Sequence, residues 1–325
     1  MEDILKLLRE LSTEEKAALV AGTDFMYTNP VPRLDISQVR MSDGPHGLRV
    51  QQQGGDNGIA GSEPATAFPT AALTACGWNE DNLWKMGQAI GAEARHYGIN
   101  VVLGPGVNIK RNPLAGRNFE YFSEDPLLAG KMGAAEINGI QSRGVGVSLK
   151  HFALNNAENY RFMGDSVCDE RAMREIYLKA FEIAVKAAKP ETVMCAYNKI
   201  NGTYCCQNKW LLSDVLRKEW GFDGLVMTDW GATHDRIEML KAGLDRTLRR
   251  GYSRVESNRN KRLGSNVYVF FRRQRILPEG RTWRFLIYLR RNLLCQGNGC
   301  RQHQLHRRGK NSKYNSATQP CHKRK

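Results

Sequence analysis

The chain has 325 residues, of which 41% are hydrophobic and 25% charged, a composition typical of a soluble globular protein. This length suffices for one large α/β barrel or two ordinary domains. No stretch approaches the roughly 18 apolar residues of a membrane-spanning helix. No cationic segment leads into an apolar one at the N-terminus, so membrane insertion and secretion are not indicated and a cytoplasmic location is expected.

The formal net charge of +15 is divided unevenly along the chain. Residues 1–245 hold 26 Lys and Arg against 31 Asp and Glu, whereas residues 246–325 hold 22 against 2. The second segment contains 17 Arg and no Asp, and such a mixture cannot readily bury enough apolar surface to fold. We therefore predict a folded domain over 1–245 and a basic tail of low order over 246–325.

Helical and strand patterns alternate over the first segment. Two amphipathic helices are expected within residues 3–21, where Ser12 and Glu15 form a capping box before the second. Short apolar runs that end in polar or glycine-rich turns predict strands within 35–47, 99–109, 145–156, 191–202 and 223–232. Helical patterns lie between them at 80–98, 125–144, 169–189 and 210–221. This alternation predicts a parallel sheet covered by helices.

Polar residues at the ends of the predicted strands favour a (β/α)₈ barrel over an open sheet. Five residues occupy such positions: Asp43, Lys150, His151, Tyr197 and Asp229. In a barrel the carboxyl ends of all strands converge on one face, where the active site lies. An open sheet would use mainly the strand ends near one crevice.

Several local motifs have less consequential interpretations. The segment Gly104–Ile109 resembles a dinucleotide-binding loop, but Ile109 stands where the final glycine is required. Asn201, Gly202 and Thr203 form a formal glycosylation acceptor, which a cytoplasmic chain would not use. The cysteines before residue 246 are expected to be reduced and mostly buried, with a redox pair at the adjacent Cys205 and Cys206 as the weaker alternative.

Asp229 is the candidate catalytic residue. It follows the apolar run GLVMT and precedes Trp230, so a carboxylate would lie at the barrel mouth beside an aromatic ring on which a sugar could pack. Glycoside hydrolysis needs two carboxyl groups, one that attacks or activates water and one that protonates the leaving oxygen. Taken alone, Asp229 could equally be a helix-capping aspartate.

Five longer segments strengthen the hydrolase interpretation. Met41–Arg49, Asn108–Pro126, Leu149–Phe162, Cys195–Gly202 and Gly224–Ala232 resemble glycoside hydrolase family 3 in order and spacing, and the likeness covers about residues 10–245. The resemblance implies a β-glucosidase that releases terminal β-D-glucosyl residues by a retaining mechanism, with Asp229 as the nucleophile. The expected substrate is a β-glucoside or short oligosaccharide, with no metal or organic cofactor.

The resemblance also implies the residues that bind the sugar. These are Asp43, Arg49, Arg117, Lys150, His151, Arg161, Tyr197 and Trp230. Each has a less specific interpretation: Lys150 and His151 could be merely solvated, and Arg117 and Glu120 could form an exposed ion pair of little energetic value. His46, between Pro45 and Gly47, is assigned to a turn and not to the site.

The sequence departs from the family within Lys241–Asp245, where the arginine-rich segment begins. In this family the acid/base carboxylate comes from a second, α/β sandwich domain, and nothing in residues 246–325 resembles it. We therefore expect the barrel to be incomplete at its C-terminal end. The abrupt change of charge suggests a reading-frame error in the encoding gene. Because general acid catalysis contributes typically about 10²–10⁴-fold, little activity is expected from the chain as written.

Three rival functions remain open at the level of sequence. A non-catalytic sugar binder would share every pocket residue. The basic tail could bind nucleic acid, weakly and without sequence preference, so no specific nucleic-acid partner is expected. A zinc site could form from Cys295, Cys300, His303 and His306, although their spacing misses the usual zinc-finger patterns.

Overall fold

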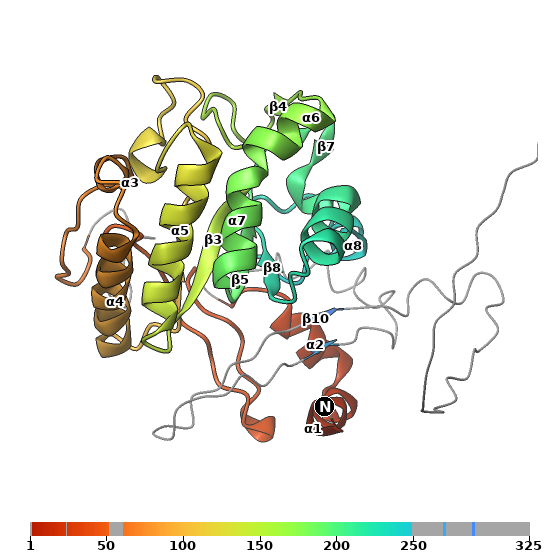
Figure 1. Ribbon diagram of the computed structural model, residues 1–325. Helices are drawn as coiled ribbons and strands as arrows, with labels where there is room; N and C mark the ends of the chain where they lie inside the picture. The colour runs from red at the N-terminus through yellow and green to blue at the C-terminus, as the bar shows by residue number, and fades with distance from the viewer. Residues whose placement is uncertain (1, 24, 52–60, 249–268, 271–287, 290–325) are drawn as a thin grey trace, which may run out of the picture. The chain divides into compact units, whose positions relative to one another are not determined.

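The computed structural model describes residues 2–23, 25–51, 61–248, 269–270 and 288–289 (Figure 1). The N-terminal helices form as predicted, as α1 (Glu2–Glu10) and α2 (Thr13–Leu19). The capping box is present: the Ser12 hydroxyl accepts from the Glu15 amide at 3.2 Å, and the Glu15 carboxylate accepts from the Ser12 amide at 2.8 Å. These contacts satisfy amides that a helix start leaves without partners.

All five predicted strands form one parallel sheet. Its members, in spatial order, are β1 (Met41–Asp43), β2 (Val101–Leu103), β3 (Gly146–Phe152), β5 (Thr192–Cys195) and β8 (Leu225–Met227). Neighbours in space are also neighbours in the strand–helix alternation of the sequence. This is the strand order of a (β/α) barrel, in which each crossover helix returns the chain to the next strand.

The helical segments follow the strands and cover the sheet. They are α3 (Ala71–Ala75), α4 (Glu80–His96), α5 (Pro126–Gln141), α6 (Glu170–Ala172), the π-helical η3 (Met173–Tyr177), α7 (Lys179–Ala188), the π-helical η5 (Trp210–Glu219) and α8 (Arg236–Ala242). Three short 3₁₀ turns lie at Pro32–Leu34 (η1), Asn118–Glu120 (η2) and Cys205–Gln207 (η4). Helices α4, α5 and α7 lie side by side along one layer (Figure 1).

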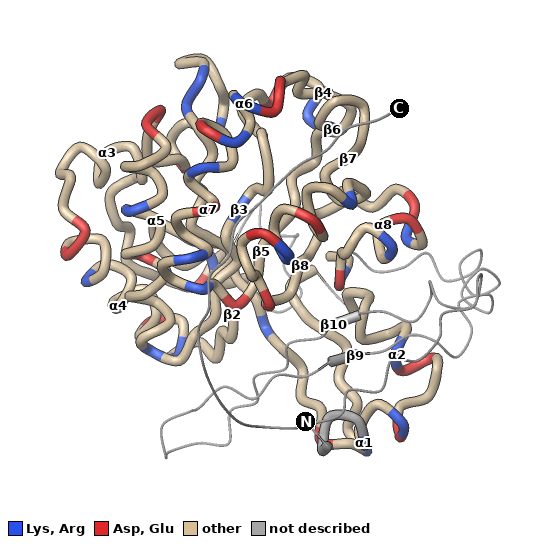
Figure 2. The backbone as a smooth tube through the Cα atoms, turned by 45° about the vertical axis from the view of Figure 1, so that its right-hand side comes forward, with Lys and Arg blue, Asp and Glu red and all other residues tan. Residues whose placement is uncertain are grey.

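Aspartate and asparagine side chains begin four of these helices. Asn79, Asp125, Asp169 and Asp235 accept hydrogen bonds from amides in the first turns of α4, α5, α6 and α8. These caps fix where each crossover helix starts after its strand. Acidic and basic residues both occur along the backbone of these helices (Figure 2).

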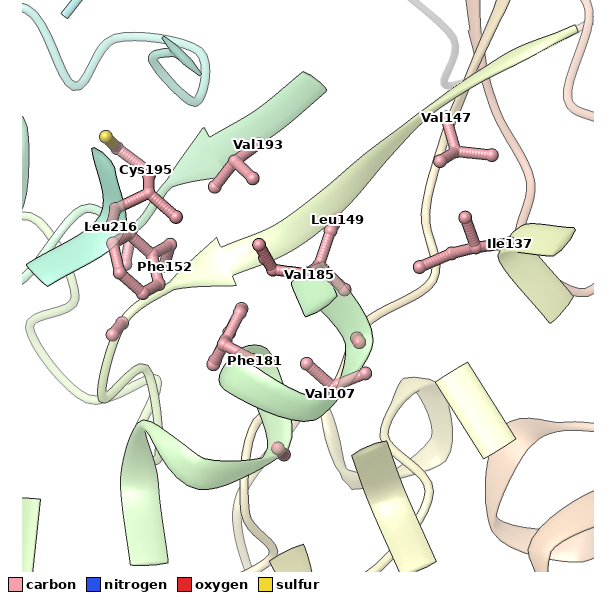
Figure 3. Packing of buried hydrophobic residues seen from close by; sticks show 14 of the residues in the cluster. Val107, Ile137, Val147, Leu149, Phe152, Phe181, Val185, Val193, Cys195 and Leu216 are labelled. Atoms are coloured by element: carbon pink, nitrogen blue, oxygen red, sulfur yellow. The ribbon is translucent and has the colours of Figure 1, made fainter. Parts of the chain in front are cut away.

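The main core lies between β3, β5 and the helices that cover them. Val147 and Leu149 of β3 lie near Ile137 of α5 and Val185 of α7, and all four side chains are at most 3% exposed (Figure 3). Phe152, at the end of β3, meets Phe181 of α7 edge to face with ring centroids 5.2 Å apart. Burial of apolar side chains of this size stabilises by about 1.5–3 kcal/mol each. The core therefore holds the end of β3 in a fixed position.

The chain stays beside the sheet just after residue 245. Arg246 forms a parallel bridge with Met227 of β8, the Leu248 amide donates to Thr228 Oγ1 at 2.9 Å, and the Thr247 amide donates to the Val20 carbonyl at 3.1 Å. The described residues thus supply five strands of the barrel and the start of a sixth pairing. The predicted division between residues 245 and 246 stays a prediction.

Two smaller sheets complete the described structure. β4 (Asp165–Ser166), β6 (Lys199–Ile200) and β7 (Thr203–Tyr204) form one, with Asn201 and Gly202 in the turn between β6 and β7. β9 (Val269–Phe270) pairs antiparallel with β10 (Tyr288–Leu289), within the segment predicted to be of low order. In the part of the chain that the structure describes, no helix has the length and apolarity that crossing a bilayer requires.

The cysteines of the described segment are all free thiols. Cys195, Cys205 and Cys206 are buried as expected, whereas Cys76 is exposed and Cys168 half-buried. Burial raises the pKa of the Cys205 and Cys206 thiols, which favours the unreactive thiol form over a redox pair.

Candidate active site

The carboxyl ends of the parallel strands bring the candidate residues together. Asp43 ends β1, Lys150 and His151 lie near the end of β3, Tyr197 follows β5 by two residues, and Asp229 follows β8 by two residues. Because the strands are parallel, these ends lie at the same edge of the sheet.

Asp229 is 5% exposed and is held through one of its two oxygens. Its Oδ1 accepts a hydrogen bond from the Tyr197 hydroxyl at 2.8 Å and from the Trp230 amide at 2.7 Å. Its Oδ2 lies 3.5 Å from Nε2 of His151. The carboxylate is therefore oriented by residues from two other strands and by its own chain neighbour.

The protonation of Asp229 reflects two opposing effects. Burial raises its pKa, since the charged form loses hydration. The Tyr197 hydrogen bond and the Arg117 charge lower the pKa without cancelling the effect of burial. A carboxylate that is deprotonated yet poorly hydrated is suited to attack carbon.

A buried cluster of cations and carboxylates lies beside Asp229. Arg117 Nε and Nη2 donate to the two oxygens of Glu120 at 2.7 and 2.9 Å, and Lys150 Nζ lies 3.0 Å from Glu120 Oε1. Lys150 Nζ also lies 3.8 Å from Asp43 Oδ1. Arg117 Nη2 lies 2.9 Å from His151 Nε2, so the contacts run continuously from Asp43 to Asp229.

Two of the less specific interpretations are wrong. The Arg117 and Glu120 side chains pair as proposed, but they are only 19% and 7% exposed, so the pair is not an exposed one. Lys150 and His151 are 4% and 1% exposed and hence not merely solvated. Such burial is expensive for charged groups unless they are paired, and here each charge has a partner.

Glu120 is the site residue that sequence reasoning missed as part of the site. Burial raises its pKa, but Lys150 and Arg117 outweigh burial and hold that pKa below the usual range. The sequence feature that could have indicated this role is the i, i+3 spacing of Arg117 and Glu120 across η2. The sequence does not reveal that Glu120 is buried. His46, assigned to a turn, also lies close enough for Glu120 and Lys150 to affect its pKa, which burial lowers.

Arg161 and Trp230 flank the cluster. The Arg161 guanidinium lies 4.6 Å from the Tyr197 ring centroid and donates to Glu158 at 3.1 Å. The Trp230 indole donates to the Phe25 carbonyl at 2.9 Å and stacks on the Phe25 ring with centroids 5.4 Å apart. Both residues thus have fixed positions next to the residues that hold Asp229.

Arg49 is the predicted residue that the structure joins least to the others. It pairs with Asp43 through the backbone, its amide donating to the Asp43 carbonyl at 2.9 Å, while its side chain is exposed. In the segments that the structure describes, no three His, Cys, Asp or Glu side chains gather as metal ligands. The candidate zinc ligands at 295–306 lie outside the described residues.

Fold and site together define a class: a (β/α)-barrel protein whose strand ends hold a buried carboxylate among paired cations. The profile of the glycosyl hydrolase family 3 N terminal domain matches residues 33–251, and the chain belongs to this family. The predicted barrel and the predicted family are confirmed.

The chain is similar to several known proteins. It is 52% identical over 244 residues to thermostable β-glucosidase B of Acetivibrio thermocellus, covering 75% of this chain and 32% of that protein. It is 50% identical over 248 residues to an exo-α-(1→6)-L-arabinopyranosidase of Bifidobacterium longum, covering 76% and 33%. The structure of β-glucosidase 3B from Thermotoga neapolitana in complex with glucose matches with a TM-score of 0.71 at 46% identity, covering 75% and 36%. The chain thus spans about a third of the length of the curated relatives it matches.

Proposed function

We propose that this chain carries the nucleophile and the sugar-binding residues of a retaining β-glucosidase. The observation that carries the proposal is the state of Asp229, which is buried, oriented through Oδ1 and connected to Arg117 and Lys150 by a continuous set of contacts. The family membership and the β-glucosidases among the relatives support it.

In the proposed reaction, a carboxylate oxygen of Asp229 forms a bond to the anomeric carbon of a terminal β-D-glucosyl residue. The bond from that carbon to the leaving oxygen breaks, and the leaving oxygen takes a proton from a general acid. Water then cleaves the glycosyl ester and restores the carboxylate. Hydroxyl groups of the sugar would contact Asp43, Lys150, His151 and Arg161, and these contacts strengthen as positive charge develops at the anomeric carbon.

The general acid is proposed to lie outside the family-matched region 33–251. Glu120 is the buried carboxyl nearest in the contact network, but its low pKa keeps it ionised and its oxygens are taken by Arg117 and Lys150. The aligned segments make up only 32% and 33% of two of the relatives. Without an added acid, the chain should act only on glycosides whose leaving groups depart without protonation.

A trapping experiment tests the nucleophile. The full chain is incubated with 2,4-dinitrophenyl 2-deoxy-2-fluoro-β-D-glucoside, and its mass and peptide map are measured. We expect one fluoroglucosyl adduct on the peptide that contains Asp229, none in Asp229→Asn, and normal labelling in Asp81→Asn, a matched change in the first turn of α4. An adduct elsewhere, or labelling of Asp229→Asn, would contradict the proposal. Sugar binding without any adduct would favour the non-catalytic sugar binder.

An α-L-arabinopyranoside is the second candidate substrate, because a Bifidobacterium relative that is 50% identical is an exo-α-(1→6)-L-arabinopyranosidase. The same trapping experiment with the corresponding fluorinated arabinopyranoside decides between the two sugars. If the arabinopyranoside labels the chain faster, the proposed sugar is arabinopyranose in place of glucose. The proposed role of Asp229 is then unchanged.

We also propose that the sequence beyond about residue 245 is read out of frame. The support is the change from 26 basic and 31 acidic residues before this point to 22 and 2 after it. Translating the encoding DNA in the other two frames should recover a sequence resembling the longer relatives. If neither frame does so, this idea is wrong.

A further inference from the structure

His151 is held by contacts to its backbone and to both nitrogens of its ring. Its backbone is fixed by Asn108, which is 1% exposed: the His151 amide donates to Asn108 Oδ1 at 2.8 Å, and Asn108 Nδ2 donates to the His151 carbonyl at 2.9 Å. Both ring nitrogens also have partners. Nε2 lies 2.9 Å from Arg117 Nη2, and Nδ1 lies 3.0 Å from the Tyr121 hydroxyl.

The contact with Arg117 indicates which ring nitrogen carries the proton. A guanidinium has only donors, so its N–H can approach Nε2 at hydrogen-bond distance only if Nε2 offers a lone pair. In a neutral imidazole the proton then resides on Nδ1. The Tyr121 hydroxyl has two lone pairs, and it can therefore accept from His151 Nδ1–H as well as from Asn155 Nδ2 at 3.2 Å.

The surroundings also oppose protonation of the ring. Burial and the nearby Arg117 charge lower the pKa of His151 well below its usual value. The charged groups that influence the ring come from four segments of the chain and are Arg117, Glu120, Lys150, Arg161 and Asp229. The negative charges of Glu120 and Asp229 favour the imidazolium, but burial and the three cations outweigh them, and Glu120 is already paired with two of these cations.

From these contacts we propose that Tyr121 is a positioning residue that holds His151 as the neutral tautomer with its proton on Nδ1. Nε2 then presents a lone pair between Arg117 and Asp229. This single lone pair accepts from Arg117, so His151 has no N–H at Nε2 that it could donate to Asp229. The structural part of the proposal is independent of the reaction, whereas its catalytic consequence rests on the proposed function.

The lone pair has a consequence for the nucleophile. Both hydrogen bonds that the described residues give to Asp229 end on Oδ1, from Tyr197 and Trp230. Oδ2 faces His151 Nε2 at 3.5 Å, which in this tautomer is not a donor. Oδ2 is therefore the oxygen with more available electron density, and it forms the bond to the anomeric carbon.

The tautomer is measured directly by NMR on the full chain labelled with ¹⁵N-histidine, with the His151 signals assigned from their loss in His151→Gln. We expect the pattern of a neutral ring protonated at Nδ1, unchanged between pH 5 and pH 8. A ring protonated at Nε2, or an imidazolium in this range, would overturn the proposal whatever the activity of the chain.

The role of Tyr121 is tested by Tyr121→Phe, with Tyr97→Phe as the matched control, since the Tyr97 hydroxyl donates to the Pro64 carbonyl away from the site. In Tyr121→Phe we expect the His151 signals to show mixed or Nε2-protonated rings, and the rate of Asp229 labelling to fall about tenfold, as for loss of one buried hydrogen bond. Tyr97→Phe should change neither. An unchanged His151 spectrum in a folded Tyr121→Phe chain would show that Tyr121 has no positioning role.

If wild type forms no fluoroglucosyl adduct but shows the expected tautomer, the proposed function fails and this inference stands. If the adduct forms while the ring is protonated at Nε2, the inference fails and the proposed function stands. A crystal structure of the trapped chain would show which oxygen of Asp229 bears the sugar.

Discussion

At the scale of single residues, Asp229 is governed by a competition between burial and hydrogen bonding. Burial raises its pKa, and the hydrogen bond from the Tyr197 hydroxyl lowers this pKa more than any other group does. The Tyr197 and Trp230 donors therefore favour the charged form of a poorly hydrated carboxylate, against the effect of burial. This arrangement links the reactivity of Asp229 to a residue on a neighbouring strand.

Replacing Tyr197 by Phe should raise the pKa of Asp229 further, because a donor to the charged form is lost while burial stays. The rate of labelling by the fluoroglucoside should fall at acidic pH, and its low-pH limb should move to higher pH, with an overall loss of roughly ten- to a hundredfold. The rate is measured against pH. Tyr160→Phe, a change at a residue 81% exposed, should leave the profile in place, and a Tyr197→Phe profile that matches wild type would contradict the argument.

Glu120 holds two buried cations, so its removal should affect stability as well as activity. In Glu120→Gln, Arg117 and Lys150 would lose the carboxylate that neutralises them, and loss of one partner of a buried pair costs about 3–5 kcal/mol. The control is Glu219→Gln, which removes the partner of the partly exposed Arg174 and should cost under about 1 kcal/mol. The free energy of unfolding of both variants is measured by chemical denaturation. Equal losses in the two variants would show that burial of the Arg117–Glu120–Lys150 group is unimportant.

At the scale of elements, the close packing of α4 on α5 depends on two glycines. A β-carbon at Gly87 would lie 2.4 Å from the Glu136 carbonyl oxygen, and one at Gly139 would lie 2.2 Å from the Trp84 carbonyl oxygen. These oxygens belong to the facing helix and cannot move without shifting its backbone. The absence of side chains at these positions thus sets the distance between the two helices.

Gly139→Ala should therefore destabilise the protein although alanine favours helices, because overpacking costs typically about 1–3 kcal/mol. Gly77→Ala is the matched control, since the nearest atom to its added carbon lies 3.4 Å away. The free energy of unfolding is measured for both. A Gly139→Ala chain as stable as the control would mean that α4 and α5 can separate freely.

Helix α5 also buries Glu136, whose two oxygens have no hydrogen-bond partner among the residues that the structure describes. Burial raises its pKa to about 8 from 4.5. Between these pH values the folded chain binds more protons at this residue than the unfolded chain, so stability falls as pH rises through this window. Glu136→Gln should remove that decline and be more stable than wild type by several kcal/mol above pH 8. Parallel stability–pH curves for the two chains would contradict this.

At the scale of the whole molecule, the site depends on the meeting of distant strand ends. The periodicity of the sequence predicted all five strands of the sheet, and the residues expected at their ends lie there. The positions of Glu120 and Tyr121 could not be predicted, because their burial depends on contacts with β3 some 30 residues further along the chain. The assignment of Arg49 to the sugar site stays a prediction that rests on the family resemblance.

The dependence of the rate on the leaving group reflects where the general acid lies. If the acid lies outside the matched region, the chain should release dinitrophenol from its β-glucoside at least 10²-fold faster than it hydrolyses cellobiose. A rate on cellobiose close to that on the dinitrophenyl glucoside would show that a proton donor is present in this chain. The comparison is made by measuring glucose release from both substrates at equal concentration.

The sequence by itself determined the order of strands and helices, because apolar periodicity and capping residues act over a few positions. It also determined which polar side chains stand at strand ends and where the charge balance changes. Only the tertiary structure decided that the Arg117–Glu120 pair is buried, that His151 faces both Arg117 and Asp229, and that α4 and α5 touch through glycines. Burial, and with it the strength of charge interactions and the position of protons, depends on residues that the chain brings together from far apart in the sequence.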